Sequence, residues 1–504
     1  MLVSDIVANN ARSRGAAVAL VVGEEEVTYG RLAELVGETA RALAGRGIGH
    51  GDRVAVLAKN GLEYVQLYFA TAAIGAILVP LNFWHRAAEH AHTVGDSAPS
   101  LLFVEAQYDE VIAEVRPELP VLRLPGPEND RGDWDAFLAG GADVPDVPVH
   151  DDDPHMILYT SGTTGRPKGA MLSHRRTVDD ALAMALVLRA HDRDVFMNYF
   201  PPFHVGNWDH MKPFLLVGAK VVLLREFDAD AVLRLLPRHR VSVILGVPTM
   251  LHALITHPAF ERTDTSSVRL LYYGAYDPSG IMDRTADAFG AREGRIEMAH
   301  TYGLTEGGPF VTWCPPADVF RRWGSVGRAM PGVTLALLDD DGAEVPRGEP
   351  GEICVRGPRM SGYWRNAEAS AAALAGGWLH TGDVAVADAD GFLTIVDRKK
   401  DMIRSGGQNV WSKEVEDCLS QHPAVAEVAV IGLPDPVYEE QVAAVVVPAG
   451  EPGPALADEL TAFVRTRLAG YNTPKALHFV DALPRNAVGK LQKHLLRERF
   501  TPLT

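Results

Sequence analysis

A polar, glycine-rich stretch at residues 159–169 separates two apolar runs and constrains the fold around it. It reads Tyr-Thr-Ser-Gly-Thr-Thr-Gly-Arg-Pro-Lys-Gly, between the apolar runs 156–158 and 170–172. Glycine lets successive backbone N–H groups turn toward one point, and such a concave backbone attracts anions. Hydroxyl groups add donors, and Lys168 adds a full charge. The stretch therefore predicts a phosphate-binding loop that leaves a buried strand, with a flexible polar loop as the alternative. It is not the G-x-x-x-x-G-K-[ST] loop, because no helix-opening GK[ST] follows.

Segments with helical and extended periodicity alternate along residues 1–150. Strand-like runs occur at 54–57, 77–80 and 101–104, and residues 31–46 repeat apolar side chains with a period near 3.6. Strands that alternate with helices indicate βαβ crossovers and parallel sheets. We therefore expect an α/β fold.

Length and charge limit the classes of protein that this chain can belong to. At 504 residues it is too long for one hydrophobic core, so several domains are expected. A net charge of −17 with scattered basic residues argues against a nucleic-acid partner. Cys314, Cys354 and Cys418 show no metal or redox spacing, which favours a reducing compartment. The chain also lacks a leader pattern and an apolar run of membrane-spanning length, so a cytoplasmic protein without a membrane partner is predicted.

Two further polar motifs carry groups that suit nucleotide chemistry, and a third ends in a lysine. Tyr302-Gly-Leu-Thr-Glu306 ends in a carboxylate, the hard oxygen ligand that Mg²⁺ takes when it bridges phosphates. Asp383 follows a Thr-Gly turn and is suited to accept two ribose hydroxyls, as an acidic residue does in dinucleotide-binding folds. Pro484-Arg-Asn-Ala-Val-Gly-Lys490 ends in a lysine that, taken alone, indicates only a solvated charge.

The motifs and their order resemble those of the acyl-adenylate-forming superfamily, which includes acyl-CoA synthetases, luciferases and peptide-synthetase adenylation domains. The resemblance covers nearly the whole chain. It implies an AMP-forming acid–CoA ligase that uses ATP, Mg²⁺ and coenzyme A on a small carboxylic acid. The implied α/β fold has a large amino-terminal domain with two packed mixed or parallel sheets flanked by helices and a distorted β-barrel. The large domain would span residues 1–396. A hinge at 397–400 and a small, mobile α+β domain at 401–504 would follow.

The resemblance assigns a role to each nucleotide-binding residue. Tyr302 would stack on adenine, Thr305 would donate to the α-phosphate, and Glu306 would hold Mg²⁺. Lys490 would be the adenylation lysine and would act with Glu306, Thr160 and Lys168. The implied ATP- and AMP-binding residues are Thr160, Ser161, Gly162, Thr163, Thr164, Gly165, Lys168, Gly274, Ala275, Tyr302, Gly303, Thr305, Asp383, Arg398 and Lys490.

The resemblance places the acid pocket in three segments that hold unusual polar residues. His204 lies in a segment that lines the acyl pocket in the superfamily; a packed core histidine is the alternative. Asp209 replaces the usual apolar residues, so either the pocket is partly polar or this side chain faces solvent. Asp277 is a second departure: if buried it needs a cationic or donor partner such as a substrate amino group, and a solvent-exposed side chain is the alternative. The implied pocket residues are His204, Val205, Asn207, Trp208, Asp209, Tyr276, Asp277 and His300, with core packing as the alternative for His300.

The carboxy-terminal motifs imply a reaction in two steps. Lys400 matches the residue about which the small domain turns, and Gly406 and Gly407 match the turn that the pantetheine arm of coenzyme A approaches. The acid would first become an acyl-adenylate with release of pyrophosphate, and the acyl group would then pass to the thiol. Three alternatives stay open: transfer to a carrier-protein thiol, activation of nitrite to diazotise an aryl amine, and an inactive nucleotide-binding protein. A homodimer is also left open.

Overall fold

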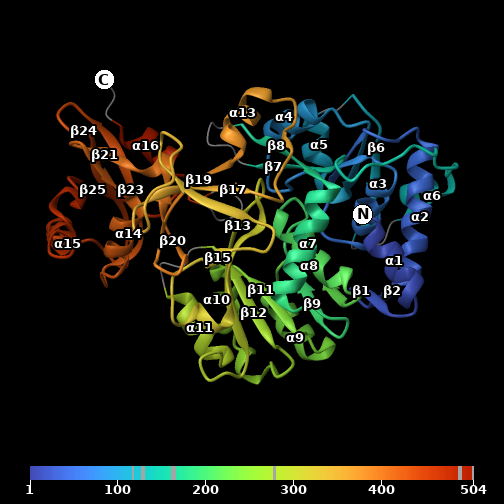
Figure 1. Ribbon diagram of the computed structural model, residues 1–504, viewed down its shortest axis with the longest axis horizontal. Helices are drawn as coiled ribbons and strands as arrows, with labels where there is room; N and C mark the ends of the chain where they lie inside the picture. Colours follow the sequence, from blue (N-terminus) through green and yellow to red (C-terminus); the bar gives the residue numbers. More distant parts are fainter. Residues whose placement is uncertain (116–117, 127–130, 161–165, 276–279, 486–490, 502–504) are drawn as a thin grey trace. The chain divides into compact units, whose positions relative to one another are not determined.

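The computed structural model describes residues 1–115, 118–126, 131–160, 166–275, 280–485 and 491–501 (Figure 1). Contacts divide the chain into two compact units. The first consists of Met1–Ala275, Ile281–Leu335 and Val355–Thr381, and the second is built mainly from Ala336–Cys354 and Gly382–Thr504.

The first unit contains a seven-stranded sheet of order β18-β8-β7-β4-β3-β5-β6. Strands β7, β4, β3, β5 and β6 are parallel, whereas β8 and β18 add an antiparallel edge. The strands are rich in Val, Ile and Leu because helices cover both faces of such a sheet. Their bounds are β3 Arg53–Leu57, β4 Ile77–Pro80, β5 Leu101–Glu105, β6 Val121–Leu124, β7 Pro154–Thr160, β8 Lys168–Ser173 and β18 Gly362–Tyr363.

A nine-stranded sheet of order β15-β14-β13-β12-β11-β9-β10-β1-β2 forms the rest of this unit's strand framework. Its central strands from β13 to β1 are parallel, and β2, β14 and β15 are antiparallel to their neighbours. The bounds are β1 Val18–Val22, β2 Glu25–Thr28, β9 Val195–Asn198, β10 Lys220–Leu223, β11 Val243–Gly246, β12 Leu270–Gly274, β13 Glu297–Leu304, β14 Gly308–Cys314 and β15 Arg328–Ala329.

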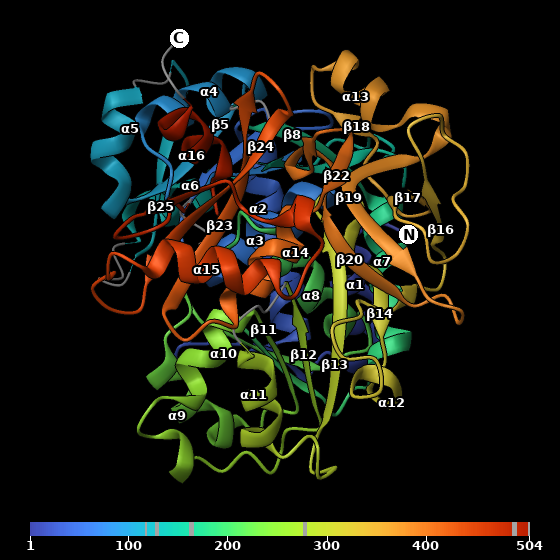
Figure 2. The same cartoon turned by 90° about the vertical axis from the view of Figure 1, so that its left-hand side faces the viewer.

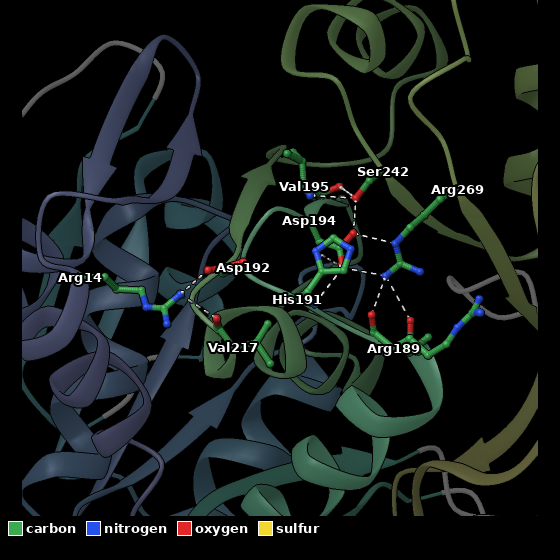
Figure 3. Close-up of polar contacts among 10 residues, drawn as sticks. Arg14, Arg189, His191, Asp192, Asp194, Val195, Val217, Ser242 and Arg269 are labelled. Atoms are coloured by element: carbon green, nitrogen blue, oxygen red, sulfur yellow. Dashed lines mark hydrogen bonds and ion pairs between the residues drawn. The ribbon is translucent and has the colours of Figure 1, made fainter.

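A partly buried ion pair joins the amino ends of neighbouring strands of this sheet (Figure 3). Asp194 precedes β9, Ser242 precedes β11 and Arg269 precedes β12. The Nε and Nη2 atoms of Arg269 lie 2.8 and 2.7 Å from the two carboxylate oxygens of Asp194, and the Ser242 hydroxyl donates to the same carboxylate at 2.7 Å. Burial alone would raise the pKa of Asp194, but the hydrogen bonds from Arg269 and Ser242 outweigh it and hold this pKa below its ordinary value. This pair lies at the amino ends of the strands. In open α/β sheets, ligands bind at the opposite, carboxyl ends, where the nucleotide site is predicted.

Side chains cap the first turn of several helices. Ser173 accepts a hydrogen bond from the Arg176 amide at the start of α7, and Thr28 accepts one from the Arg31 amide at the start of α2. Helices α7 and α8 run side by side in the first unit (Figure 1). The helices of this unit are α1 Asp5–Arg14, α2 Tyr29–Gly45, α3 Leu62–Ala73, α4 Ala87–Ser97, α5 Asp109–Val115, α6 Gly132–Ala139, α7 His174–Leu188, α8 Val205–Leu216, α9 Ala229–His239, α10 Pro248–Ile255, α11 Ile281–Phe289, α12 Pro316–Val319 and α13 Ala367–Ala373.

The second unit contains a four-stranded sheet and a five-stranded sheet (Figure 2). The four-stranded sheet has the order β16-β17-β19-β20. The five-stranded sheet packs α14 and α15 on one face and α16 on the other. The bounds are β16 Thr334–Leu338, β17 Gly351–Arg356, β19 Leu379–Ala387, β20 Leu393–Arg398, β21 Ile403–Ser405, β22 Gln408–Val410, β23 Val425–Asp435, β24 Glu439–Pro448, β25 Ala476–Phe479, α14 Ser412–Ser420, α15 Leu456–Arg465 and α16 Lys493–Phe500.

The predicted α/β class is confirmed, including the parallel strands and the smaller carboxy-terminal sheet. The predicted helix at 31–46 corresponds to α2, and the strands predicted at 54–57, 77–80 and 101–104 correspond to β3, β4 and β5. The domain bounds at 396 and 401 stay a prediction, since both lie within the second compact unit. Among the described residues, no helix has both the length and the apolarity that a bilayer crossing requires.

Candidate active site

The two ends of the predicted phosphate loop are held together by a strand pair. Strands β7 and β8 are antiparallel, with Thr160 opposite Lys168 and Tyr159 opposite Gly169. Ile157 and Tyr159 pack against Gly169, where an added Cβ would lie 2.6 Å from the Ile157 side chain, so glycine is required by space. The predicted phosphate ligands Ser161, Gly162, Thr163, Thr164 and Gly165 lie outside the described residues.

Glu306 lies beside this pair, in the turn between β13 and β14. The Thr160 hydroxyl donates to the Glu306 carboxylate at 3.2 Å, and the Tyr363 hydroxyl donates to the same oxygen at 3.0 Å. The Lys168 ammonium lies 5.3 Å from the centre of the Tyr363 ring, within the range of a cation–π contact. The structure therefore brings together three of the four residues for which catalytic roles were expected; Lys490 lies outside the described residues.

Tyr363 is the residue of this cluster that the sequence reasoning missed. It lies on β18, a two-residue strand at the edge of the seven-stranded sheet, opposite Ala170 of β8. Burial raises its pKa, and the neighbouring Glu306 carboxylate raises it further, so the phenol stays protonated and can donate. The sequence signal was weak, because a lone Gly-Tyr-Trp triplet has no motif that indicates a role.

A second group of predicted nucleotide residues lies at the carboxyl ends of β12 and β13. Gly274 is opposite Thr301 in the strand register, and Ala275 has a positive φ of 83°, a strained backbone for a residue with a Cβ. Gly303 has no room for a side chain, because a Cβ would lie 2.2 Å from the Pro309 carbonyl oxygen. Tyr302 is 9% exposed. Their predicted roles toward adenine and phosphate stay predictions.

His300 lies on β13, two residues before Tyr302. It is 6% exposed, its ring stacks on Tyr273 at 4.2 Å, and its Nδ1 is 2.8 Å from the Ser325 carbonyl oxygen. Burial lowers its pKa to about 4, so the imidazole is neutral near pH 7. The packing matches the core alternative, and a pocket role stays a prediction. The predicted pocket residues Tyr276 and Asp277 lie outside the described residues.

The predicted pocket residues on α8 differ in their surroundings. His204 caps the helix, with its Nδ1 accepting a hydrogen bond from the Gly206 amide at 3.0 Å, and it is exposed, so the alternative of a packed core histidine is wrong. Trp208 is 1% exposed and stacks on Tyr68 at 4.2 Å. Asn207 donates to the Asn60 side chain at 2.6 Å, and Val205 is buried.

Asp209 is part of a buried group of charges. Its carboxylate forms ion pairs with Lys212 on the same helix and, at 2.8 Å, with Arg176 on α7. Asp209 and Lys212 are each 1% exposed, so the alternative that this face of α8 points to solvent is wrong. Burial opposes the ionisation of Asp209, but Lys212 and Arg176 outweigh it and set its pKa at about 2. Both carboxylate oxygens of Asp209 have partners within the protein. A role of Asp209 in lining the acid pocket stays a prediction.

Thr305, another predicted nucleotide-binding residue, directly follows β13 in the turn that carries Glu306. The remaining described site residues belong to the second unit. Asp383 on β19 lies opposite Arg398 on β20, and Arg398 Nε is 3.2 Å from its carboxylate. Gly406 and Gly407 form the β21–β22 turn with φ values of 59° and 77°, which favour glycine. Lys400 is exposed. The ribose, hinge and coenzyme A roles stay predictions.

Comparisons with known proteins agree with this geometry. The pattern of the AMP-binding enzyme family matches residues 7–364, and that of its carboxy-terminal domain matches residues 414–490. A feruloyl-CoA synthase of Amycolatopsis is 39% identical over 97% of both chains, and an indoleacetate–CoA ligase of Aromatoleum aromaticum is 37% identical over 94% of this chain and 93% of that one. An o-succinylbenzoate CoA synthetase of Bacillus subtilis, solved with its acyl-adenylate intermediate, has a TM-score of 0.86 at 28% identity and covers 99% of this chain and 98% of its own. The resemblance seen in the motifs is confirmed: the chain belongs to the AMP-binding enzyme family, within the acyl-adenylate-forming superfamily.

Proposed function

We propose that this chain uses ATP to activate an aromatic carboxylic acid and transfers the acyl group to coenzyme A. The observation that carries the first step is the convergence of Thr160, Lys168 and Glu306 on one locus, with Tyr363 between them. Acid activation joins two anions, so cations and hydrogen-bond donors at this locus supply most of the catalysis.

In the first half-reaction, a carboxylate oxygen of the acid attacks the α-phosphorus of ATP. The bond from that phosphorus to its bridging oxygen breaks, and pyrophosphate leaves. A carboxylic acid is already ionised near pH 7, so the enzyme needs no general base for this step. Lys168 and the Thr160 hydroxyl suit the phosphate oxygens, whereas Lys490 would neutralise charge that develops at the α-phosphate.

The Glu306 carboxylate fits the magnesium ion that this chemistry implies. It offers a hard oxygen ligand, and the hydroxyl donors of Thr160 and Tyr363 fix its orientation. When bound, Mg²⁺ would screen the charge of the triphosphate. Phosphate oxygens and water would complete its coordination, as is usual for this ion.

The aromatic class of the acid is supported by the side chains around α8. His210, which is 5% exposed, lies 5.4 Å from Phe310 and 5.6 Å from Tyr272, measured between ring centres. Burial lowers the pKa of His210 to about 3, so the ring is neutral and pairs with the Tyr272 hydroxyl at 3.0 Å. A neutral polar pair among aromatic rings favours an aryl acid with a polar substituent over a saturated chain. Two relatives of this chain, a feruloyl-CoA synthase and an indoleacetate–CoA ligase, are named for aromatic acids.

The test is a pyrophosphate-release assay on the purified full chain. Hydroxycinnamic, indoleacetic, aminobenzoic, medium-chain and long-chain fatty acids are supplied in turn, each with and without coenzyme A. The proposal expects the highest kcat/KM for an aryl acid and an acyl-CoA product identified by mass spectrometry. A saturated acid as the best substrate contradicts the aromatic class, and no response to any acid contradicts the activity. Parallel reactions with a carrier protein and with nitrite plus an aryl amine identify the other acceptors.

A further inference from the structure

A charged pair on α7 contacts both ends of the turn that carries Glu306. Arg176 and Asp180 lie four residues apart on one face of this helix, at 3% and 4% exposure. The Nη2 atom of Arg176 lies 3.5 Å from the Thr305 carbonyl oxygen and 3.4 Å from an Asp180 carboxylate oxygen. At the other end of the turn, the Asp180 carboxylate packs on Gly308, where an added Cβ would lie 2.6 Å from its Oδ2.

This pair is held in turn by α8. Arg176 Nη1 donates to Asp209 at 2.8 Å, and Asp209 also binds the buried ammonium of Lys212. Arg176 thus contacts α8 through Nη1 and the Glu306 turn through Nη2. Burial of such charges costs more than their attraction returns in many proteins, and apolar replacements are often equally stable. Stability therefore gives no reason for a cluster of this kind next to a reactive carboxylate.

The turn itself is restrained on its remaining sides by other contacts. The Met360 amide donates to the Glu306 carbonyl oxygen at 2.7 Å, and the Thr160 and Tyr363 hydroxyls hold the Glu306 carboxylate. Leu304 and Gly308 are opposite each other in the β13–β14 register, so the turn spans only residues 305–307. A contact at each end of so short a turn sets the direction of its central side chain.

We propose that Arg176 and Asp180 are positioning residues that aim the Glu306 carboxylate at the metal–nucleotide complex, with Asp209 and Lys212 as their support. The proposal rests on the function proposed above for Glu306. It also gives the polar residues of α8 a role that does not require contact with the acid.

The test measures Mn²⁺ binding by electron paramagnetic resonance in the presence of α,β-methylene-ATP, so it does not depend on turnover. The main variant is Arg176→Met with Asp180→Asn, which leaves Asp209 paired with Lys212. We expect its Mn²⁺ affinity to fall by about 10-fold or more, the usual effect of removing a group that orients a metal ligand. Transfer of a supplied acyl-adenylate to coenzyme A should change far less. Wild-type Mn²⁺ affinity in the folded double variant would overturn the proposal.

The matched control is Arg269→Met with Asp194→Asn, which removes the partly buried pair of Figure 3 at the other end of the strands. This control should lower the melting temperature without changing Mn²⁺ affinity. If it lost as much Mn²⁺ affinity as the main variant, the loss would reflect general destabilisation, and the proposal would be overturned. Should the main variant fail to fold, Asp180→Ala alone removes the contact with Gly308, and wild-type Mn²⁺ affinity in that variant overturns the proposal. Glu306→Gln separates the two proposals, because wild-type Mn²⁺ affinity in this variant refutes the role of Glu306 itself.

Discussion

The hydroxyl of Thr160 donates a hydrogen bond to the carboxylate of Glu306 at 3.2 Å, although 146 residues separate them in the chain. Thr160 ends β7 of the seven-stranded sheet, whereas Glu306 lies in the turn between β13 and β14 of the nine-stranded sheet. The seven-stranded and nine-stranded sheets therefore contribute jointly to one site within the first unit. Had Glu306 and Lys168 lain on opposite faces, the enzyme interpretation would have failed.

Replacement of Thr160 by Val should lower the rate of acid-dependent pyrophosphate release by about 10- to 100-fold, the range for loss of a group that orients a metal ligand. Valine keeps the shape of the side chain but cannot donate to Glu306. Thr160→Ser keeps the hydroxyl and should retain most of the rate. The measurement is kcat with saturating ATP, and equal rates in the valine and serine variants would contradict the role of the hydroxyl.

Replacement of Tyr363 by Phe should raise the Mg²⁺ concentration at half-maximal rate by about 10-fold. The variant removes the hydrogen bond to Glu306 at 3.0 Å but leaves the ring that faces Lys168. A Mg²⁺ titration of pyrophosphate release measures this shift. The KM for coenzyme A should stay unchanged, and a change confined to that constant would argue against a metal-site role for Tyr363.

Lys490→Ala should abolish the exchange of pyrophosphate into ATP and largely spare thioester formation from a supplied acyl-adenylate. Negative charge develops at the α-phosphate only in the first half-reaction, and the proposed role of Lys490 is to neutralise that charge. Isotope exchange and acyl-CoA formation are measured on the same preparation. Lys493→Ala is a nearby control outside the motif. Equal loss of both half-reactions in Lys490→Ala would refute the division of labour.

Replacement of Arg269 by Met should destabilise the first unit by about 3–5 kcal/mol, because it leaves the buried Asp194 carboxylate without its cation. The pH dependence follows from the lowered pKa of Asp194. A lowered folded-state pKa stabilises the fold at a pH above the unfolded value of about 3.9, and this contribution is lost as the pH falls through the folded pKa. Chemical denaturation of wild type and Asp194→Asn at pH 7 and at about pH 3 measures it. The stability difference between them should shrink at the lower pH, and a constant difference would refute the assignment.

The local motifs were predictable because each one is a short run of residues with its own backbone requirement. The glycines of 159–169 and the carboxylate of Glu306 are visible without a structure, and periodicity gave the strands β3, β4 and β5. Tyr363 was not predictable, since its place beside Glu306 depends on the pairing of a two-residue strand with β8. No local pattern encodes that pairing.

The polar residues of α8 illustrate a second limit. The sequence showed that Asp209 departs from the usual apolar pattern, and it left a polar pocket and a solvent-facing side chain as the two explanations. The structure pairs Asp209 with Arg176, which lies 33 residues earlier on another helix, a contact that neither explanation included. Whether a charge is buried beside a partner depends on helix packing, which sequence periodicity does not specify for a helix that is buried all round.

Replacement of Tyr272 by Phe should change substrate preference more than overall activity. The variant removes the hydroxyl that pairs with His210 at 3.0 Å and leaves the ring packing with Phe310 and Trp313. If that pair recognises a polar ring substituent, its loss costs a hydroxylated acid about 10-fold or more in kcat/KM, because a buried polar group is left without a partner. An unsubstituted cinnamic acid should lose much less. The measurement is the ratio of kcat/KM for the two acids, with Tyr273→Phe, a neighbour on the same strand, as the control. An unchanged ratio in Tyr272→Phe would show that the His210–Tyr272 pair only packs the core.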